Sequence, residues 1–158
     1  MVRIGITGHS ALTAVSVPLV VEAFREVLGG QEDITGVTCL ARGADQLFAR
    51  AVLDLGGTIE VVLPSADYRE RKVKPAELTE FDELVGKAAD VYTMPFAEAG
   101  RDAYMAASEH VLSIVDELVA VWDGAPASGR GGTSDVVEAA HARGMKVTAI
   151  WPGGCARA

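Results

Sequence analysis

The stretch that decides the fold runs from residue 117 to residue 140, ELVAVWDGAPASGRGGTSDVVEAA. Its apolar run at residues 118–122 is typical of a buried strand, and a glycine-rich loop follows. A helix is predicted to begin at Thr133, with Asp135 in its first turn. Glycines between a strand and a helix permit positive φ angles and let a ligand approach the main chain. The first N–H groups of the helix favour an anion by roughly 0.3–1 kcal/mol, so the stretch predicts a phosphate site.

Two further turns repeat this arrangement in weaker form. Residues 2–7 are strand-like and lead into the turn Gly8, His9 and Ser10, and a second apolar run leads into ARGAD at residues 41–45. Ligands of open α/β sheets bind outside the carboxyl ends of the strands. We therefore expect the three turns to share one edge of one sheet.

Strand and helix patterns alternate along the whole chain. Crossovers of this length force parallel pairing, so we predict a Rossmann-like, doubly wound α/β fold with a mainly parallel sheet and helices on both faces. Residues 1–158 are expected to form a single domain. The predicted strands are residues 2–7, 34–40, 58–63, 90–94, 118–122 and 146–151, and the predicted helices are residues 17–28, 46–55, 76–89, 102–115 and 133–142.

Composition restricts the function classes. The formal net charge of −8 argues against a general nucleic-acid binder, which needs a basic surface to displace counterions. Local amides can still hold a small phosphorylated ligand in an acidic protein. Cys39 and Cys155 show no metal-ligand spacing, so no metal is expected. The N-terminus lacks a signal-peptide pattern and no run has membrane-spanning length, which predicts a cytoplasmic protein without a membrane partner.

The glycine loop supplies most of the candidate ligand-binding residues. It matches neither GxGxxG nor the P-loop motif, but it combines glycines, a cation and hydroxyl groups directly before a helix. Thr133 is expected either to cap the helix or to donate its hydroxyl group to a phosphate. Asp123, at the end of the strand, is placed to accept hydrogen bonds from a ribose or a base. The candidates here are Asp123, Gly124, Gly129, Arg130, Gly131, Gly132 and Thr133.

The two other turns supply Gly8, His9, Ser10, Arg42, Gly43 and Asp45. Asp45 either binds ligand or only complements the helix dipole. Arg42 is unfavourable at a helix N-terminus unless it meets an anion or a carboxylate. His9 is either a structural donor or a phosphate contact that titrates near neutral pH.

Residues 64–75 are predicted to form a polar loop, with several cations beside Tyr68 between residues 67 and 74. Such a charge run is usually a solvated face. The alternative is a loop that folds over the pocket, with Tyr68 stacked on a base.

Taken together, GITGHS, ARGAD, VWDG and the GGT that opens a helix resemble the SLOG superfamily over nearly the whole chain. This superfamily includes the LOG phosphoribohydrolases and the DNA-processing protein A group. The resemblance implies a nucleotide or nucleotide-derived ligand at the carboxyl edge of the sheet, and often a homodimer. It implies binding roles for Gly8 and His9 in the first turn, and for the equivalent residues of the other two turns: Arg42, Gly43, Asp45, Gly131, Gly132 and Thr133.

One departure from the LOG pattern concerns catalysis. LOG hydrolases carry PGGxGTxxE, in which the glutamate works with an arginine on the preceding helix. Val136 stands at the glutamate position here, flanked by Asp135 and Glu138, and Arg101 stands only at the start of the preceding helix. Asp135 and Glu138 are the remaining catalytic candidates.

The sequence therefore favours a nucleotide-binding sensor or carrier that needs no cofactor besides its phosphorylated ligand. The alternative is a nucleoside 5′-monophosphate N-glycosidase that releases the free base. A DNA-processing or protein-interaction module is the third hypothesis, with nucleic acid disfavoured as a partner because of the net negative charge. A homodimer is expected.

Overall fold

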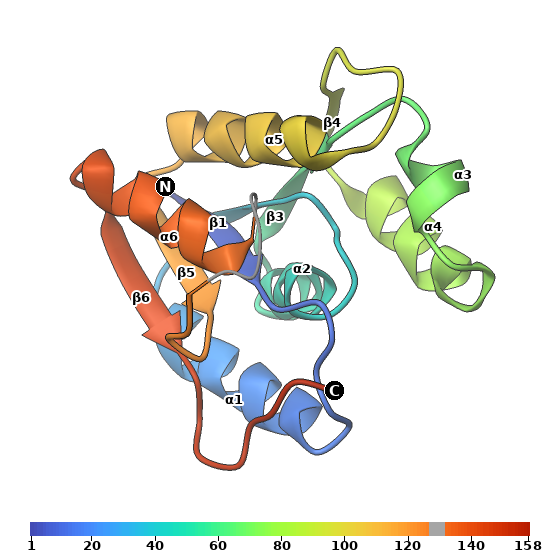
Figure 1. Ribbon diagram of the computed structural model, residues 1–158. Helices are drawn as coiled ribbons and strands as arrows, with labels where there is room; N and C mark the ends of the chain where they lie inside the picture. Colours follow the sequence, from blue (N-terminus) through green and yellow to red (C-terminus); the bar gives the residue numbers. More distant parts are fainter. Residues whose placement is uncertain (127–131) are drawn as a thin grey trace.

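The computed structural model describes residues 1–126 and 132–158 of the chain. A parallel six-stranded sheet forms its centre (Figure 1). The strands are β1 (Val2–Gly8), β2 (Ile34–Thr38), β3 (Thr58–Leu63), β4 (Asp90–Thr93), β5 (Glu117–Val121) and β6 (Lys146–Ile150). Each matches a predicted strand to within two residues at either end.

The order of the strands in the sheet is β4-β3-β2-β1-β5-β6, and every pairing is parallel. The chain builds outward from β1 through β2 and β3 to β4, and then returns to the other side of β1 with β5. The direction of winding therefore reverses between β1 and β5. Crevices for ligands in doubly wound sheets lie at such reversals.

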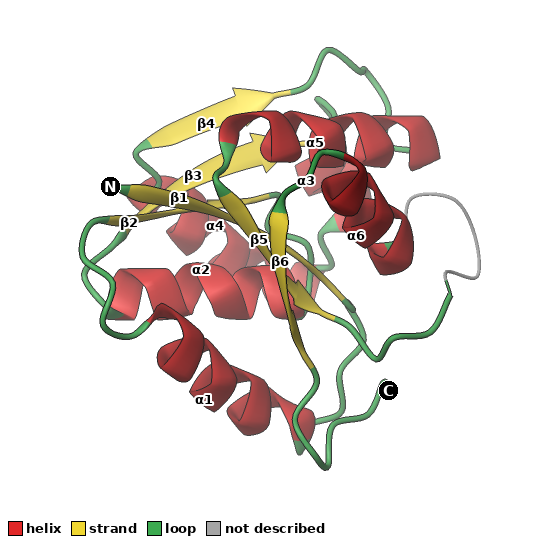
Figure 2. Ribbon diagram, turned by 90° about the vertical axis from the view of Figure 1, so that its left-hand side faces the viewer, coloured by secondary structure: helices red, strands yellow, loops and turns green. Residues whose placement is uncertain are grey.

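Helices cover both faces of the sheet (Figure 2). One face carries α1 (Ser16–Leu28) and α2 (Ala44–Asp54), with α4 (Leu78–Lys87) beside α2. The other face carries α5 (Arg101–Ile114) and α6 (Thr133–Ala142). The largest cluster of buried apolar side chains lies between the sheet and the first layer. The predicted fold class is confirmed.

One segment differs from its prediction. Within residues 64–75, expected to be a polar loop, Tyr68–Lys72 forms helix α3, and Pro75–Glu77 forms the 3-10 turn η1 before α4. Tyr68 is 7% exposed, and its ring packs against those of Phe81 and Tyr104. Tyr68 is thus a core side chain that borders the pocket with one edge. The residues that follow Tyr68 in this helix are polar and exposed, so the sequence has no apolar periodicity that would predict a helix.

The segment after β6 returns to the turn after β1. The amide of Thr13 donates to the carbonyl of Ala156 at 3.1 Å, and the amide of Ala158 donates to the carbonyl of Ala11 at 2.8 Å. The fully buried Ser16 accepts a hydrogen bond from the amide of Ala156 at 2.8 Å. These contacts hold residues 155–158 in place beside the carboxyl ends of the strands.

Candidate functional site

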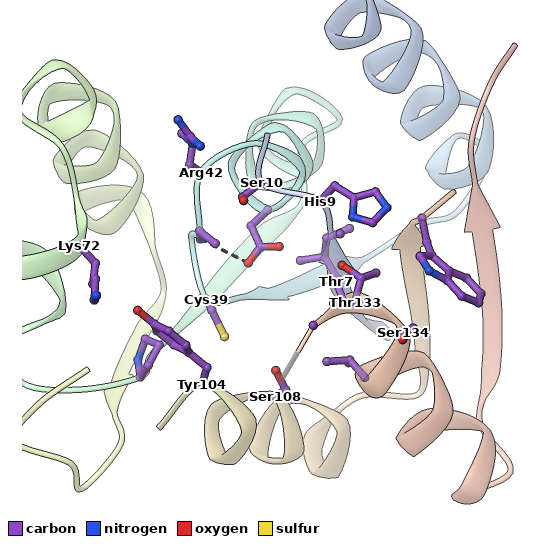
Figure 3. A pocket seen from close by; sticks show the side chains of 18 of the residues that line it. Thr7, His9, Ser10, Cys39, Arg42, Lys72, Tyr104, Ser108, Thr133 and Ser134 are labelled. Carbon is purple, nitrogen blue, oxygen red and sulfur yellow. Dashed lines mark hydrogen bonds between the residues drawn. The ribbon is translucent and has the colours of Figure 1, made fainter. Parts of the chain in front are cut away.

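A cavity of about 670 Å³ opens at the carboxyl edge of the sheet, where β1 and β5 part (Figure 3). Its walls come from the turns after β1 and β2, from the segment around α3, from α5, from the start of α6 and from the segment after β6. The three turns singled out in the sequence therefore meet, as expected.

The turns after β1 and β2 are packed tightly together. A Cβ atom on Gly43 would lie 2.5 Å from the carbonyl oxygen of Ser10, and one on Gly8 would lie 2.6 Å from the Cβ atom of Ala44. The amide of Ala44 donates to the carbonyl oxygen of His9 at 3.3 Å. Gly43 also has a φ of +83°. Glycine at these two positions lets two backbones touch, which fixes the side chains that follow them.

His9, Asp123 and Arg157 form a connected group at one side of the cavity. Arg157 donates to one carboxylate oxygen of Asp123 through Nε at 2.8 Å, with Nη2 at 2.6 Å from the same oxygen. The amide of Asp123 donates to Nε2 of His9 at 3.2 Å. Burial and then the charge of Arg157 lower the pKa of His9, so the 3.3 Å approach of its Nε2 to the Asp123 carboxylate is a contact of a neutral ring.

The carboxylate of Asp123 is thus occupied within the protein. The amide of Ala125 donates to its other oxygen at 2.9 Å. That hydrogen bond is the largest of several effects that lower the pKa of Asp123 to about 2. Asp123 is absent from the cavity wall, whereas Arg157 is part of it. Asp123 positions Arg157, and a ribose would have to compete with the guanidinium group for it.

Asp45 is a buried carboxyl group in the cavity wall. It is 7% exposed, and it accepts a hydrogen bond from the amide of Ala41 at 3.3 Å across the turn. Burial raises the pKa of Asp45 to about 7. Cys39 also lines the cavity, and burial raises the pKa of its thiol. At neutral pH, Asp45 therefore carries its proton in about half of the molecules, in a place from which water is largely excluded.

The cavity is electropositive although the protein is acidic. Among the described residues, five cationic side chains and two carboxyl groups line it: Arg42, Lys72, Lys74, Arg101 and Arg157, with Asp45 and Glu77. Nε of Arg42 lies 3.9 Å from Oε1 of Glu77, so this cation near a helix N-terminus has the carboxylate neighbour that its position was expected to need. With five cations against two carboxyl groups, the described part of the wall has a clear excess of positive charge.

The start of α6 closes the side opposite Lys72 (Figure 3). Gly132, Thr133, Ser134 and Val136 line the cavity there. Gly132 is the N-cap of α6 and forms no side-chain cap, so the expectation that Thr133 caps the helix is wrong. Gly132 has a φ of −78°, which any residue adopts. The predicted Gly129, Arg130 and Gly131 lie outside the described residues.

The candidate residues divide clearly. The cavity wall contains Gly8, His9, Ser10, Arg42, Asp45, Gly132 and Thr133, and it lacks Gly43, Asp123 and Gly124. The catalytic candidates Asp135 and Glu138 are also absent from it, because α6 turns Val136 inward and leaves Glu138 exposed.

Several residues of the wall were not expected from the sequence. Arg101, Tyr104 and Ser108 follow a spacing of three and four along α5, so they share one side of that helix. This polar stripe was a readable signal. Arg157 gave none, since it follows the last strand in a segment with no regular pattern.

Two further findings concern metal ions and membranes. Among the described residues, no group of three or more His, Cys, Asp and Glu side chains is arranged to hold a metal ion. Within the same part of the chain, no helix combines the length and apolarity needed to cross a bilayer.

Fold and cavity together define a Rossmann-like α/β protein with a cationic pocket at the reversal of its sheet. Three solved structures share this fold. DNA processing protein A (DprA) from Streptococcus pneumoniae matches with a TM-score of 0.70 and 17% identity, over 98% of this chain and 52% of that one. DprA from Helicobacter pylori matches with a TM-score of 0.70 and 15% identity, over 97% of this chain and 67% of that one.

The third structure is TM1055, a structural-genomics target, with a TM-score of 0.60 and 18% identity over 93% of this chain and 72% of that one. This chain spans about half the length of the pneumococcal DprA structure. No protein-family model and no curated protein matches the sequence. At these identities the three structures show the Rossmann-like fold that the resemblance to the SLOG superfamily implied.

The argument against nucleic acid is corrected by these structures. The Helicobacter structure is described as showing a single-stranded DNA binding mode, on the same fold. The error lay in using the net charge of the whole chain. A negative total of −8 coexists with a cavity in which cations outnumber carboxyl groups.

Proposed function

We propose that this protein binds a phosphorylated nucleotide, or a ligand derived from one, in the cavity at the carboxyl edge. The observation that carries the proposal is the convergence of five cationic side chains on one cavity of an acidic protein. A phosphate gains several charge-assisted hydrogen bonds in such a cavity, and each is roughly twice as strong as a neutral one.

The location supports the same conclusion. The cavity lies at the reversal between β1 and β5, next to the start of α6. The N-terminal amides of that helix carry partial positive charge toward the cavity. The cavity wall also offers neutral hydrogen-bonding groups such as Thr7, Ser10 and Ser108. Such groups suit the hydroxyl groups of a ribose.

The test is calorimetric titration of the protein with the four common nucleoside 5′-monophosphates and with the matching nucleosides. At least one monophosphate should bind, and it should bind more tightly than its nucleoside. Arg42→Ala should weaken monophosphate binding by about tenfold and affect nucleosides less, because hydrogen bonds to charged groups contribute about 1.5–3 kcal/mol. Arg25→Ala, which removes a cation from α1 outside the cavity, is the matched control. Equal weakening of both ligand classes by Arg42→Ala would contradict a phosphate contact.

A second candidate function is hydrolysis of the nucleotide to its free base and ribose 5-phosphate. The observation that favours it is Asp45, a carboxyl group inside the cavity that keeps its proton up to about pH 7. Water would attack C1′ of the ribose as the C1′–N bond breaks, the departing base would take the proton of Asp45, and the attacking water would then give a proton back to the Asp45 carboxylate. Arg101 lines the cavity and is available to hold the phosphate.

This candidate function requires turnover that depends on Asp45. Proton NMR of each 5′-monophosphate with catalytic amounts of protein should show free base and ribose 5-phosphate, and Asp45→Asn should abolish them. Asp135→Asn is the control, since that residue lies outside the cavity wall. Selective broadening of ligand signals without product would leave a binding protein and remove the hydrolase.

A further inference from the structure

One end of the cavity carries three cations that have no counter-charge in the part of the chain that the structure describes. Lys72 ends α3, Lys74 follows it by two residues, and Arg101 begins α5. Within the described residues, none of the three forms an ion pair or a side-chain hydrogen bond. By contrast, Arg3, Arg50, Arg69, Arg143 and Arg157 each approach a carboxylate to within 3 Å.

The contrast is informative because carboxylates are plentiful. The chain has 22 acidic and 14 basic side chains, so carboxylates outnumber the cations that could pair with them. Like charges that converge on one cavity repel one another, and the repulsion is stronger beside low-dielectric walls than in bulk water. An anion bound between them would relieve it.

This end is separated from the start of α6. In Figure 3, Lys72 and Tyr104 lie on one side of the cavity, Thr133 and Ser134 lie on the other, and Cys39 and Ser108 lie between them. Arg101 stands one turn before Tyr104 on α5, and the amide of Tyr104 donates to the carbonyl of Gly100 at 2.9 Å. The cavity therefore has two poles, with the three cations at one end and the start of α6 at the other, and Arg42 lies between them.

We infer that the cavity takes a nucleoside flanked by two phosphoryl groups, one at each pole. This inference rests on the proposed function for the pole beside α6, and it adds the second phosphoryl group at Lys72, Lys74 and Arg101. A cavity of about 670 Å³ is within the usual range of about 300–1,000 Å³ for sites that enclose a small organic ligand. Lysine is suited to this role, since its ammonium group binds phosphate as a compact charge without demanding one orientation.

Two sources share this chemistry: a free nucleoside 3′,5′-bisphosphate and the 5′-phosphorylated end of an oligonucleotide. Calorimetric titration would compare four adenosine probes: the 5′-monophosphate, the 3′,5′-bisphosphate, the dinucleotide with a 5′-phosphate and a 5′-phosphorylated hexanucleotide. The corresponding guanosine, cytidine and uridine probes follow in parallel. The bisphosphate should bind at least tenfold more tightly than the monophosphate of the same base. Equal affinity for dinucleotide and bisphosphate would indicate an open, oligonucleotide-type site, and rejection of both oligonucleotides would indicate a free metabolite.

The double variant Lys72→Ala/Lys74→Ala should remove the tenfold advantage of the bisphosphate over the monophosphate, because the second phosphoryl group loses its two lysine contacts. Arg71→Ala is the matched control, because it removes a cation from the same helix outside the cavity wall and should keep the advantage. Thermal unfolding of both variants verifies that they fold. The bisphosphate advantage should also shrink as salt rises, since its extra charge is screened.

The two proposals fail separately. Equal affinity for bisphosphate and monophosphate, or an advantage that survives the double lysine variant, would overturn the second pole and leave nucleotide binding standing. Absence of binding by every nucleotide probe would overturn both. Tight binding of the bisphosphate alone, lost in the double variant and kept in Arg71→Ala, would support both.

Discussion

Two glycine-bearing regions border the cavity, and they differ in what the glycines do. In the turns after β1 and β2, a Cβ atom on Gly43 would collide with the backbone of Ser10 and His9, at 2.5 and 2.8 Å. In the loop after β5, Gly124 has a similar positive φ of +85°, but an added Cβ atom would meet no atom of the described residues within 4 Å. The first region needs glycine for packing between two backbones, and Gly124 needs it only for its own dihedral angles.

Gly43→Ala is expected to have the largest effect on stability. The φ of +83° and ψ of −124° belong to a region that is open essentially to glycine alone, and the new methyl group would also meet two carbonyl oxygens. We expect a loss of roughly 3–5 kcal/mol in the free energy of unfolding, measured by urea denaturation. Gly124→Ala is the partner measurement and should lose only about 1 kcal/mol. Similar losses in the two variants would show that strained dihedral angles, and not contacts between the added methyl group and the backbone, cause the loss at Gly43.

The next largest effect is the pH dependence of stability caused by Asp45. Its carboxyl group accepts a hydrogen bond from the amide of Ala41 across the turn that contains Gly43. Its folded pKa of about 7 lies above its ordinary value, so the folded state binds the proton more tightly than the unfolded state. The contribution of Asp45 to the free energy of unfolding is therefore greatest below about pH 4, decreases as the pH rises to about 7, and stays constant at higher pH. Asn cannot ionise, so Asp45→Asn should gain about 2 kcal/mol on the wild type between pH 5 and pH 8.

Denaturation curves at several pH values test this expectation. Asp135→Asn, in the first turn of α6, serves as the reference, because Asp135 is half-buried whereas Asp45 is buried. A stability difference between wild type and Asp45→Asn that stays constant from pH 5 to pH 8 would contradict a proton held by Asp45.

The smallest effect concerns the turn after β1. Burial is the larger cause of the lowered pKa of His9, and the charge of Arg157 is the next. Arg157→Gln should therefore raise the pKa of His9, which NMR titration of the imidazole signals can follow. Arg143→Gln, whose guanidinium group pairs with Glu109 on α5, should leave it unchanged. If neither substitution changed the pKa of His9, residues 155–158 would not hold Arg157 beside the turn after β1 in solution.

Much of the fold could be predicted because its signals are local. Apolar runs of strand length alternate with helical periodicity, and glycines mark the helix ends, so five helices and six strands were found. Helix α3 was missed because a helix of one turn with one buried residue, Tyr68, leaves no period to detect. The polarity of its other residues favoured a loop.

The site was less predictable, for reasons that differ by residue. Gly8, His9, Ser10, Arg42 and Asp45 could be placed because parallel strands bring their ends to one edge. The partnership of Asp123 with Arg157 spans 34 residues and depends on how residues 155–158 fold back, which no local pattern encodes. The charge of the cavity was misjudged because a sum over the chain does not show which cations are paired.

The strand order also has a consequence for how the protein is made. Strand β1 is synthesised first and lies inside the sheet, paired with β2 through Val2 and Ile34 and with β5 through Ile4 and Glu117. At roughly 5–20 residues per second, β5 leaves the ribosome on the order of ten seconds after β1. Until then one edge of β1 has unpaired backbone groups, an opportunity for association with other chains. The nascent chain therefore passes through a stage in which four strands can pair while half of the cavity wall does not yet exist.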